Sequence, residues 1–313
     1  MRVLKQRSGS TNLKPLKQRS GSTSSKPLKQ RTGSNFGGST NLKRLPRAAA
    51  VDLVLAAASF LAVFPLLWMV SMSFMPAGEA NAFPARLIPH HPTFANYTEL
   101  FAHQRMGRYL VNSLLVASLA TVLSLAFNVT AGYAFAKLRF RGREKLFQGL
   151  LAALVIPGQL TMLPLFFLLK TLHLLNSYLG VVLPFTASLF GIFLVRQFAL
   201  GLPDEMLQAA RVDGASEWQI FRRIVLPNLR PIMVTLAVFT FLGAWNDFLW
   251  PLIVLSDDHY YTLPLAIASL SQEHIQDTGM VMAGATVTIV PVIVLFLALQ
   301  RQYVRGLLPG SVK

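Results

Sequence analysis

Six apolar stretches alternate with polar segments along the chain, and each is long enough to cross a lipid bilayer. They lie at residues 51–75, 110–136, 147–169, 179–199, 232–255 and 280–300. A transmembrane helix needs about 20 mostly apolar residues. The pattern therefore predicts an all-α membrane protein with six transmembrane helices. Prolines occur inside five of the six stretches, and a helix bundle tolerates them when neighbouring groups satisfy the freed carbonyls.

The Lys and Arg content of the loops predicts the orientation. With the amino terminus inside, the inner segments after residue 50 carry 13 basic residues and the outer segments carry four. The outer loop 256–279 has no Lys or Arg and holds Asp257, Asp258, Glu273 and Asp277. We therefore expect both termini in the cytoplasm.

The composition agrees with a membrane protein. Hydrophobic residues make up 53% of the chain and charged residues 13%, against about 25% charged residues in a typical soluble domain. The mean hydropathy is +0.48. The absence of cysteine excludes disulfides and thiolate metal ligands.

The net charge of +16 comes mainly from the first 50 residues, which hold 12 of the 29 Lys and Arg and no acid. The segment Leu4–Thr11 recurs as Leu16–Thr23 and, with two changes, as Leu28–Asn35. This Ser/Gly/Lys-rich composition has too little apolar surface to fold, so residues 1–47 are predicted to form a disordered basic tail before a membrane domain at 48–313. No apolar segment near Met1 marks a cleaved signal peptide.

Three interpretations of the tail remain open. The first is a solvated extension, produced by repeat expansion or by a wrongly assigned start codon. The second is electrostatic attachment to anionic lipid, which contributes about 1 kcal/mol per basic residue near the surface. The third, nucleic-acid binding, lacks an aromatic platform or folded motif, so no nucleic-acid partner is expected.

The inner loop at residues 200–231 has the signals of two short helices. Pro203 suits a first helical turn, where Asp204 and Glu205 would lie at the positive end of the helix dipole. Gly214 suits the left-handed residue that ends a helix. Ser216 has the spacing of a capping box with Gln219.

The second of these helices is predicted to carry an apolar stripe. The stripe consists of Trp218, Phe221, Ile224 and Val225. Pro227 and Pro231 would bracket the return of the chain to the bilayer. The loop thus predicts a helical hairpin that offers aromatic side chains to a partner; a hairpin that only caps the bundle is the alternative.

Part of this loop resembles the EAA loop of ABC-importer permeases. The matching residues are Gln208-Ala209-Ala210-Arg211-Val212-Asp213-Gly214-Ala215, followed by Phe221, Ile224, Pro227 and Pro231. Other segments are similar to the carbohydrate-uptake branch of that family, namely Asn112–Leu114, Gly132–Ala136, Trp245–Phe248 and Gln302–Gly306. The likeness is to the maltose-transporter type of second permease subunit and covers approximately residues 50–313. One departure is Gln208, where the family pattern has a glutamate.

The resemblance implies the type I ABC-importer permease fold and a place in the inner (plasma) membrane of a prokaryotic cell. A second permease subunit would complete the channel as a heterodimer, within membrane lipid. Two copies of an ATPase subunit would use ATP and Mg, and an extracytoplasmic solute-binding protein would deliver a sugar, polyol or glycerol phosphate. The chain itself would be no enzyme and would bind no cofactor.

The resemblance also implies a role for residues 203–227, here named the coupling segment. This segment would dock on the ATPase and transmit its closure to the channel. The residues expected to make the contact are Gln208, Ala209, Ala210, Asp213, Gly214, Ala215, Phe221 and Pro227.

Trp245, Asn246 and Asp247 are candidate substrate-pathway residues. They lie in the 232–255 stretch toward its outer half, and an ionisable residue at membrane depth is a functional candidate by default. Trp245 and Trp250 would stack on a sugar ring. The alternative is packing, with Trp250 in an interfacial aromatic belt and Asp247 bonded to a neighbouring helix.

Several kinds of site are not expected. No G-x-x-x-x-G-K-[ST] phosphate loop occurs, so the energy for transport would come from another chain. No nucleophile elbow or H-E-x-x-H motif marks catalytic residues. His90 and His91 form the only adjacent histidine pair, without an acid at ligand spacing, so no metal site is expected. An ion-gradient-driven secondary transporter is the alternative function, but related halves and several intramembrane charges are lacking.

Overall fold

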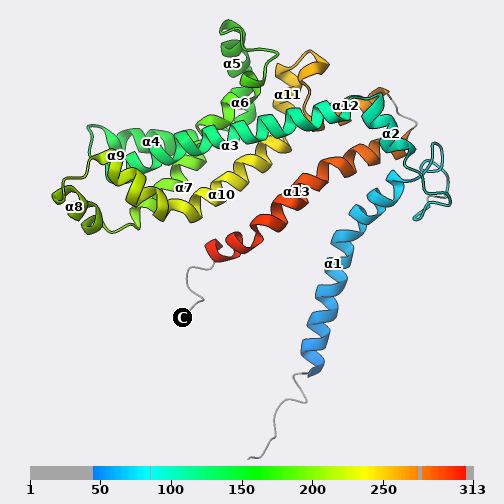
Figure 1. The fold of residues 1–313 in the computed structure, drawn as a ribbon, viewed down its shortest axis with the longest axis horizontal. Helices are drawn as coiled ribbons and strands as arrows, with labels where there is room; N and C mark the ends of the chain where they lie inside the picture. The colour runs from blue at the N-terminus through cyan, green and yellow to red at the C-terminus, as the bar shows by residue number, and fades with distance from the viewer. Residues whose placement is uncertain (1–44, 85, 274–276, 308–313) are drawn as a thin grey trace, which may run out of the picture. The chain divides into compact units, whose positions relative to one another are not determined.

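The computed structural model describes residues 45–84, 86–273 and 277–307, and every regular element among them is a helix (Figure 1). The predicted all-α class is therefore confirmed. The repeats within Leu4–Asn35 lie outside the described residues. The chain divides into two units, residues 1–55 and 56–313. The described part of the first unit is the beginning of α1, and the remaining elements belong to the second unit.

Short segments connect most of the helices, and a longer one, residues 74–94, connects α1 to α2. In chain order they are α1 (Leu45–Ser73), α2 (Ala95–Ala102), α3 (Met106–Lys137), α4 (Arg143–Ala153), α5 (Gly158–Thr171), α6 (Tyr178–Thr186), α7 (Leu189–Leu200), α8 (Asp204–Val212), α9 (Glu217–Ile220), the π-helical turn η1 (Phe221–Val225), α10 (Leu226–Trp245), α11 (Leu249–Val254), the 3₁₀ turn η2 (Asp258–Tyr260), α12 (Leu263–Glu273) and α13 (Thr278–Leu307).

Five helical segments of the described chain are long and apolar enough to cross a membrane. They are Ala49–Ser73, Met106–Lys137, Tyr178–Leu200, Glu217–Trp245 and Thr278–Ala298. The third predicted stretch, 147–169, is instead a bent pair, in which α4 and α5 meet at 106°. Five of the six predicted spans thus have a helical segment long enough to cross the membrane, although Tyr178–Leu200 consists of α6 and α7 with a short break at residues 187–188. The sixth span exists only if the bent pair counts as one span.

The bend between α4 and α5 has a local cause. Pro157 lies immediately before α5 with an extended backbone, φ −58° and ψ 132°. A proline also disfavours helical geometry in the residue before it, here Ile156. Pro164 lies inside α5 without ending it, so the position of a proline within a stretch, and not its presence alone, decides where the helix breaks.

The fifth predicted stretch, 232–255, has different ends in the structure. The helix begins at Glu217, because α9, η1 and α10 follow one another without a break, and it ends at Trp245. Residues 246–248 are not helical, and α11 follows them. The expectation that Asn246 and Asp247 lie inside a transmembrane helix is therefore wrong.

The second unit has two apolar clusters, and α3 contributes to both. One contains Val116, Ala117 and Ala120 of α3 together with Trp245, Val254 and Met280. The other contains Val129, Tyr133 and Ala136 of α3 together with Val195, Leu207 and Phe221. Because α3 passes through both clusters, it is the element that connects the two ends of the unit.

The helices around α3 pack closely through small and polar residues. A Cβ atom built on Gly132 would lie 2.6 Å from the Cβ atom of Val195 in α7, so these two backbones approach each other as closely as a glycine allows. The Ser124 hydroxyl lies 3.1 Å from that of Thr240 in α10, and the Asn128 side chain donates to Ser124 at 2.7 Å. Asn128 therefore takes part in a hydrogen-bond network between α3 and α10.

Candidate functional site

The coupling segment begins with α8 at Asp204. Pro203 lies just before the helix as its N-cap, and not in the first turn as expected. Asp204 and Glu205 occupy the first turn, as predicted, where the helix dipole favours negative charge. Leu207 is the one buried side chain of α8. In Figure 1, α8 lies at the end of the helices formed by α3, α4, α7 and α10.

The end of α8 is a Schellman motif centred on Gly214. This glycine has a φ of +81°, which confirms the predicted left-handed helix end. Its N–H donates to the Arg211 carbonyl at 3.1 Å, and the Ala215 N–H donates to the Ala210 carbonyl at 3.0 Å. A Cβ atom at position 214 would meet nothing within 4 Å. The turn therefore needs a residue that tolerates positive φ, while the chain leaves the space beside it open.

The predicted capping box at the start of α9 is confirmed. The Gln219 N–H donates to the Ser216 hydroxyl at 3.3 Å, and the Ser216 N–H donates to the Gln219 side-chain oxygen at 2.8 Å. α9 then continues through the π-helical turn η1 into α10. Pro227 near the start of α10 and Pro231 inside it do not separate the hairpin from the membrane helix. The coupling segment is therefore continuous with α10.

Two ion pairs brace the coupling segment. Arg211 contacts Glu217 across the turn with Nε–Oε1 at 2.6 Å and Nη2–Oε2 at 3.3 Å. Lys137, the last residue of α3, donates to Asp204 Oδ1 at 2.6 Å. The Lys137 hydrogen bond and its positive charge lower the pKa of Asp204 below its ordinary value, so this carboxylate is ionised at neutral pH. The Glu217 carboxylate likewise raises the pKa of Arg211 above its ordinary value.

The predicted apolar stripe does not face outward as a whole. Phe221 and Val225 are buried, and the Phe221 ring packs 5.3 Å from the Tyr133 ring of α3. The expectation that Phe221 is offered to a partner is not met in this structure. The large apolar side chains that the coupling segment does expose are Val212, 87% exposed, and Trp218, 64% exposed.

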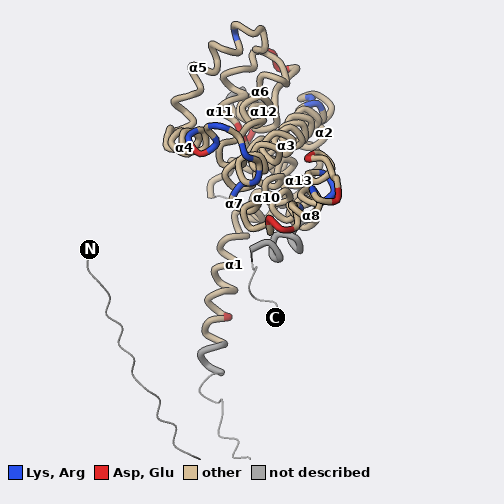
Figure 2. Tube along the Cα trace, turned by 90° about the vertical axis from the view of Figure 1, so that its left-hand side faces the viewer, with Lys and Arg blue, Asp and Glu red and all other residues tan. Residues whose placement is uncertain are grey.

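The other residues expected at the docking surface lie on its accessible side. Gln208, Ala209, Asp213, Gly214 and Pro227 are exposed, and Ala210 and Ala215 are partly exposed. Figure 2 shows Lys and Arg around α4, and both basic and acidic residues on α8. The accessible surface of the coupling segment is thus a glycine turn with an exposed valine and an exposed tryptophan beside it.

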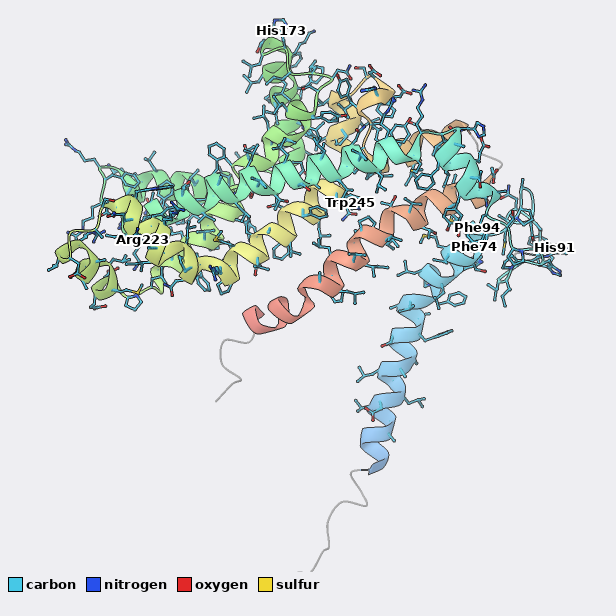
Figure 3. All side chains as sticks on the ribbon, in the orientation of Figure 1. Phe74, His91, Phe94, His173, Arg223 and Trp245 are labelled. Atoms are coloured by element: carbon cyan, nitrogen blue, oxygen red, sulfur yellow. The ribbon has the colours of Figure 1, made fainter. Side chains whose placement is uncertain are left out.

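The candidate substrate-pathway residues differ in accessibility. Trp245 is fully buried between α10 and α13 (Figure 3), and its Nε1 donates to the Thr288 carbonyl at 3.2 Å. The Trp250 indole is also buried and donates to the Gly180 carbonyl at 3.0 Å. Neither indole has a free face for a sugar in this structure. Asn246 is exposed and Asp247 is partly exposed, so these two are the accessible members of the set.

At the opposite end of α3, polar side chains hold the 257–261 loop. Arg105 Nη1 lies 3.3 Å from Asp258 Oδ2, and Arg108 Nη1 lies 3.1 Å from His259 Nδ1. Asn112 donates to the carbonyls of His259 and Tyr261 at 2.9 and 3.0 Å. Asn112 thus fixes the carbonyls of this loop to the beginning of α3.

The histidines within the described residues do not gather around a common centre. Figure 3 places His91 in the loop after α1 and His173 at the end of α5. Across residues 45–84, 86–273 and 277–307, no group of three or more His, Asp or Glu side chains is arranged to hold a metal ion.

Comparison with known proteins decides the family. The family model described as "binding-protein-dependent transport system inner membrane component" matches residues 44–308. The chain belongs to this family. It is a multi-pass inner-membrane protein and a permease subunit of an ABC importer that depends on a binding protein. Such a subunit is a transport component and not an enzyme, and separate ATPase subunits use the ATP. The alternative of an ion-gradient-driven secondary transporter is therefore set aside.

Relatives of this permease include sugar-transport proteins. The chain is 39% identical over 258 residues to the arabinooligosaccharides transport system permease protein AraQ of Halalkalibacterium halodurans, with 82% of this chain and 92% of AraQ covered. It is 36% identical to the lactose transport system permease protein LacG of Rhizobium radiobacter, with 88% and 99% covered. The fold matches a chain in the crystal structure of a bacterial ABC transporter involved in the import of the acidic polysaccharide alginate. The TM-score is 0.74 at 21% sequence identity, and the match covers 84% of this permease and 98% of that chain.

Sequence reasoning missed two features of the site. In the sequence, Lys137 is one of the 13 basic residues on the segments expected inside, and Val212 is part of the 208–215 motif. Val212 had no further local signal of its role. The signal available for Lys137 was its place at the end of the second apolar stretch, beside the inner surface. Its pairing with Asp204, 67 positions away, depends on the tertiary packing of α3 against α7 and was not visible in the local pattern.

Proposed function

We propose that this permease forms half of the membrane channel of a sugar importer, and that its coupling segment receives the ATPase. A second, related permease completes the channel, and two ATPase copies bind on the cytoplasmic side. An extracytoplasmic binding protein delivers the solute to the outer loops, chiefly 76–109 and 256–279. Closure of the ATPases on ATP pulls on the coupling segment, and the helices rock between outward-open and inward-open states.

The exposed surface of the coupling segment is the observation that carries the docking proposal. Val212 and Trp218 leave apolar area in water on either side of the Gly214 turn. Fully burying a side chain of this kind contributes about 1.5–3 kcal/mol. Within the described chain the turn itself is unobstructed, because a Cβ atom at Gly214 would meet nothing within 4 Å. A partner with an apolar groove fits this surface.

The proposed orientation places both termini and the coupling segment in the cytoplasm. The distribution of Lys and Arg supports it, with 13 on the inner segments after residue 50 and four on the outer ones. The coupling segment and the 257–261 loop lie at opposite ends of α3, which is the separation that an inner ATPase and an outer binding protein require.

The proposed solute is an oligosaccharide or a related polyhydroxylated compound. The support comes from the relatives, whose names refer to arabinooligosaccharides and lactose. Asn246 and Asp247 offer amide and carboxylate groups at the break between α10 and α11, and such groups bind hydroxyl-rich solutes.

Transport in proteoliposomes tests the function. The complete complex is reconstituted with its binding protein outside and ATP inside, and uptake of labelled arabinooligosaccharides and lactose is measured. We expect uptake of a sugar that requires both ATP and the binding protein. Uptake that persists without ATP and follows an imposed ion gradient would overturn the proposal.

Asp247 is predicted to act on the solute. Its Oδ1 also accepts a hydrogen bond from the Trp250 N–H at 3.4 Å, so it caps α11. We expect Asp247→Ala and Asp247→Asn both to raise the half-saturating solute concentration, by about tenfold if one hydrogen bond to a charged group is lost. The ATPase should remain bound in both variants. Asparagine retains the oxygen that accepts the Trp250 N–H. A wild-type uptake curve for Asp247→Asn would therefore show that Asp247 stabilises α11 and does not act on the solute.

A further inference from the structure

The coupling segment is joined to the membrane helices in two different ways. Its second half, α9 and η1, continues directly into α10. Its first half, α8, has Leu207 as its one buried side chain. A groove of about 860 Å³ separates much of α8 from the end of α3 and the start of α4, and it is lined by Ala136, Arg139, Arg143, Gln208 and Arg211 among others. α8 therefore meets the rest of the unit along one side, through Leu207 with Met206 and Ala210 partly buried beside it, and leaves another side on the groove.

One side chain bridges this groove. Lys137 is the last residue of α3 and its side chain is only 6% exposed. Its Nζ donates to Asp204 Oδ1 at 2.6 Å and to the Leu202 carbonyl at 2.7 Å. A buried ammonium group is retained only where partners compensate for its lost hydration. Both partners lie at the entry to α8, so the lysine fixes the beginning of α8 to the end of α3.

α3 is suited to carry a movement across the membrane. It has 32 residues and therefore extends for about 48 Å. Of the five segments long enough to span a bilayer in the described chain, it is the one without a proline. Prolines and glycine pairs are the usual sites of helix kinks. At its other end, Arg105, Arg108 and Asn112 hold the 257–261 loop by the contacts described above.

We propose that Lys137 is a positioning residue for transport, a latch that makes α3 move with α8 and so links the coupling segment to the 257–261 loop. Without the latch, force applied to α8 would move α8 across the groove before it moved α3. The Lys137 hydrogen bond and charge lower the pKa of Asp204 below its ordinary value, so the contact joins the lysine to a carboxylate that is ionised at neutral pH.

The first test compares three variants in the reconstituted complex. Lys137→Met removes the donor, and Lys137→Arg retains a charged donor. Arg143→Met is the matched control, because it removes a basic side chain from the same groove. Arg143 donates to the Leu138 carbonyl, which lies outside the coupling segment. The readout is the number of solute molecules imported per ATP hydrolysed, measured with the amount of bound ATPase. A merely structural role would lower complex yield and leave this ratio unchanged.

For Lys137→Met we expect the number of solute molecules imported per ATP hydrolysed to fall about fivefold or more, which is the low end of typical coupling between two sites. The bound ATPase should be unchanged, Lys137→Arg should recover most of the ratio, and Arg143→Met should keep it. A wild-type ratio in Lys137→Met would overturn the latch.

A covalent replacement of the latch gives a second test. The chain has no cysteine, so Lys137→Cys with Asp204→Cys introduces a unique pair in a complex whose other subunits are also cysteine-free. We expect the unbridged pair to have a low ratio, and a short bis-methanethiosulfonate reagent that joins the two thiols to restore it. A monofunctional reagent should not restore it. Equal ratios with and without the bridge would overturn the proposal.

The latch rests on the proposed docking of an ATPase at the coupling segment, and the two can fail separately. If both Gly214→Asp and Lys137→Met import the wild-type number of solute molecules per ATP, the proposed docking site and the latch are both contradicted. If Gly214→Asp imports fewer and Lys137→Met the wild-type number, only the latch is contradicted.

Discussion

Gly214→Asp is expected to uncouple solute uptake from ATP hydrolysis while the permease stays folded in the membrane. Gly214 has a φ of +81°, and aspartate tolerates this left-handed region better than most residues. Its side chain would meet no atom of the described chain, because nothing lies within 4 Å of a Cβ at this position. The added carboxylate therefore acts on whatever covers the turn. We expect uptake to fall about tenfold or more, the effect of about 1.4 kcal/mol of lost docking energy.

Gly142→Asp is the matched control for this prediction. Gly142 has a φ of +82° and an equally open surrounding, but it lies before α4 and outside the coupling segment. Both variants place an aspartate at nearly the same positive φ and add the same charge to the same end of the unit. The measurement is uptake and ATP hydrolysis in the reconstituted complex, with the membrane level of each variant checked by immunoblot. If the two variants transport equally well, the docking role of the Gly214 turn is contradicted.

Gly132→Leu is expected to be the substitution most damaging to the folded permease. A Cβ atom at position 132 would lie 2.6 Å from both Cβ and Cγ1 of Val195 and 3.0 Å from the Arg196 backbone nitrogen. The backbone contact cannot be relieved by a rotamer change, so α3 and α7 would have to separate. Overpacking of this kind costs about 1–3 kcal/mol and occasionally more. Separation of α3 from α7 would also disturb the position of Lys137.

Gly149→Leu supplies the comparison for this prediction. Gly149 lies in α4, and a Cβ there would meet nothing within 4 Å. Replacing a helical glycine by a better helix former is intrinsically favourable by up to about 1 kcal/mol, so this control should melt no lower than wild type. The measurement is the fraction of monodisperse protein that survives heating in mild detergent, read by fluorescence-detected gel filtration. A Gly132→Leu variant that survives heating as well as Gly149→Leu would show that α3 and α7 are not in close contact.

The local signals of the coupling segment were readable from the sequence because they depend on neighbouring residues. The left-handed end at Gly214 and the capping box of Ser216 with Gln219 each involve bonds within one or two helical turns. The lengths of the apolar stretches likewise predicted most of the spans. These features need no knowledge of how the helices pack.

The exposure of individual side chains was not readable in the same way. In a membrane protein both the lipid-facing and the buried surfaces of a helix are apolar, so hydrophobicity does not identify the packed face. The sequence therefore predicted an exposed Phe221 side chain, although the ring packs on Tyr133. It likewise predicted an accessible Trp245, although this indole is buried and bonded to Thr288 of α13. The helix break at residues 246–248 falls on the polar pair Asn246-Asp247, which interrupts the apolar stretch 232–255.

Mild-detergent purification of this permease from its native membrane, with every co-purifying protein identified, tests the central proposal most directly. We expect to recover an ATPase with a phosphate loop, in two copies for each copy of this chain, and a second permease with its own EAA loop. The Gly214→Asp variant should lose ATPase in the same purification, and the Gly142→Asp variant should keep it. Recovery of the wild-type chain without an ATPase, in a form that still moves solute into liposomes lacking ATP, would contradict the proposal.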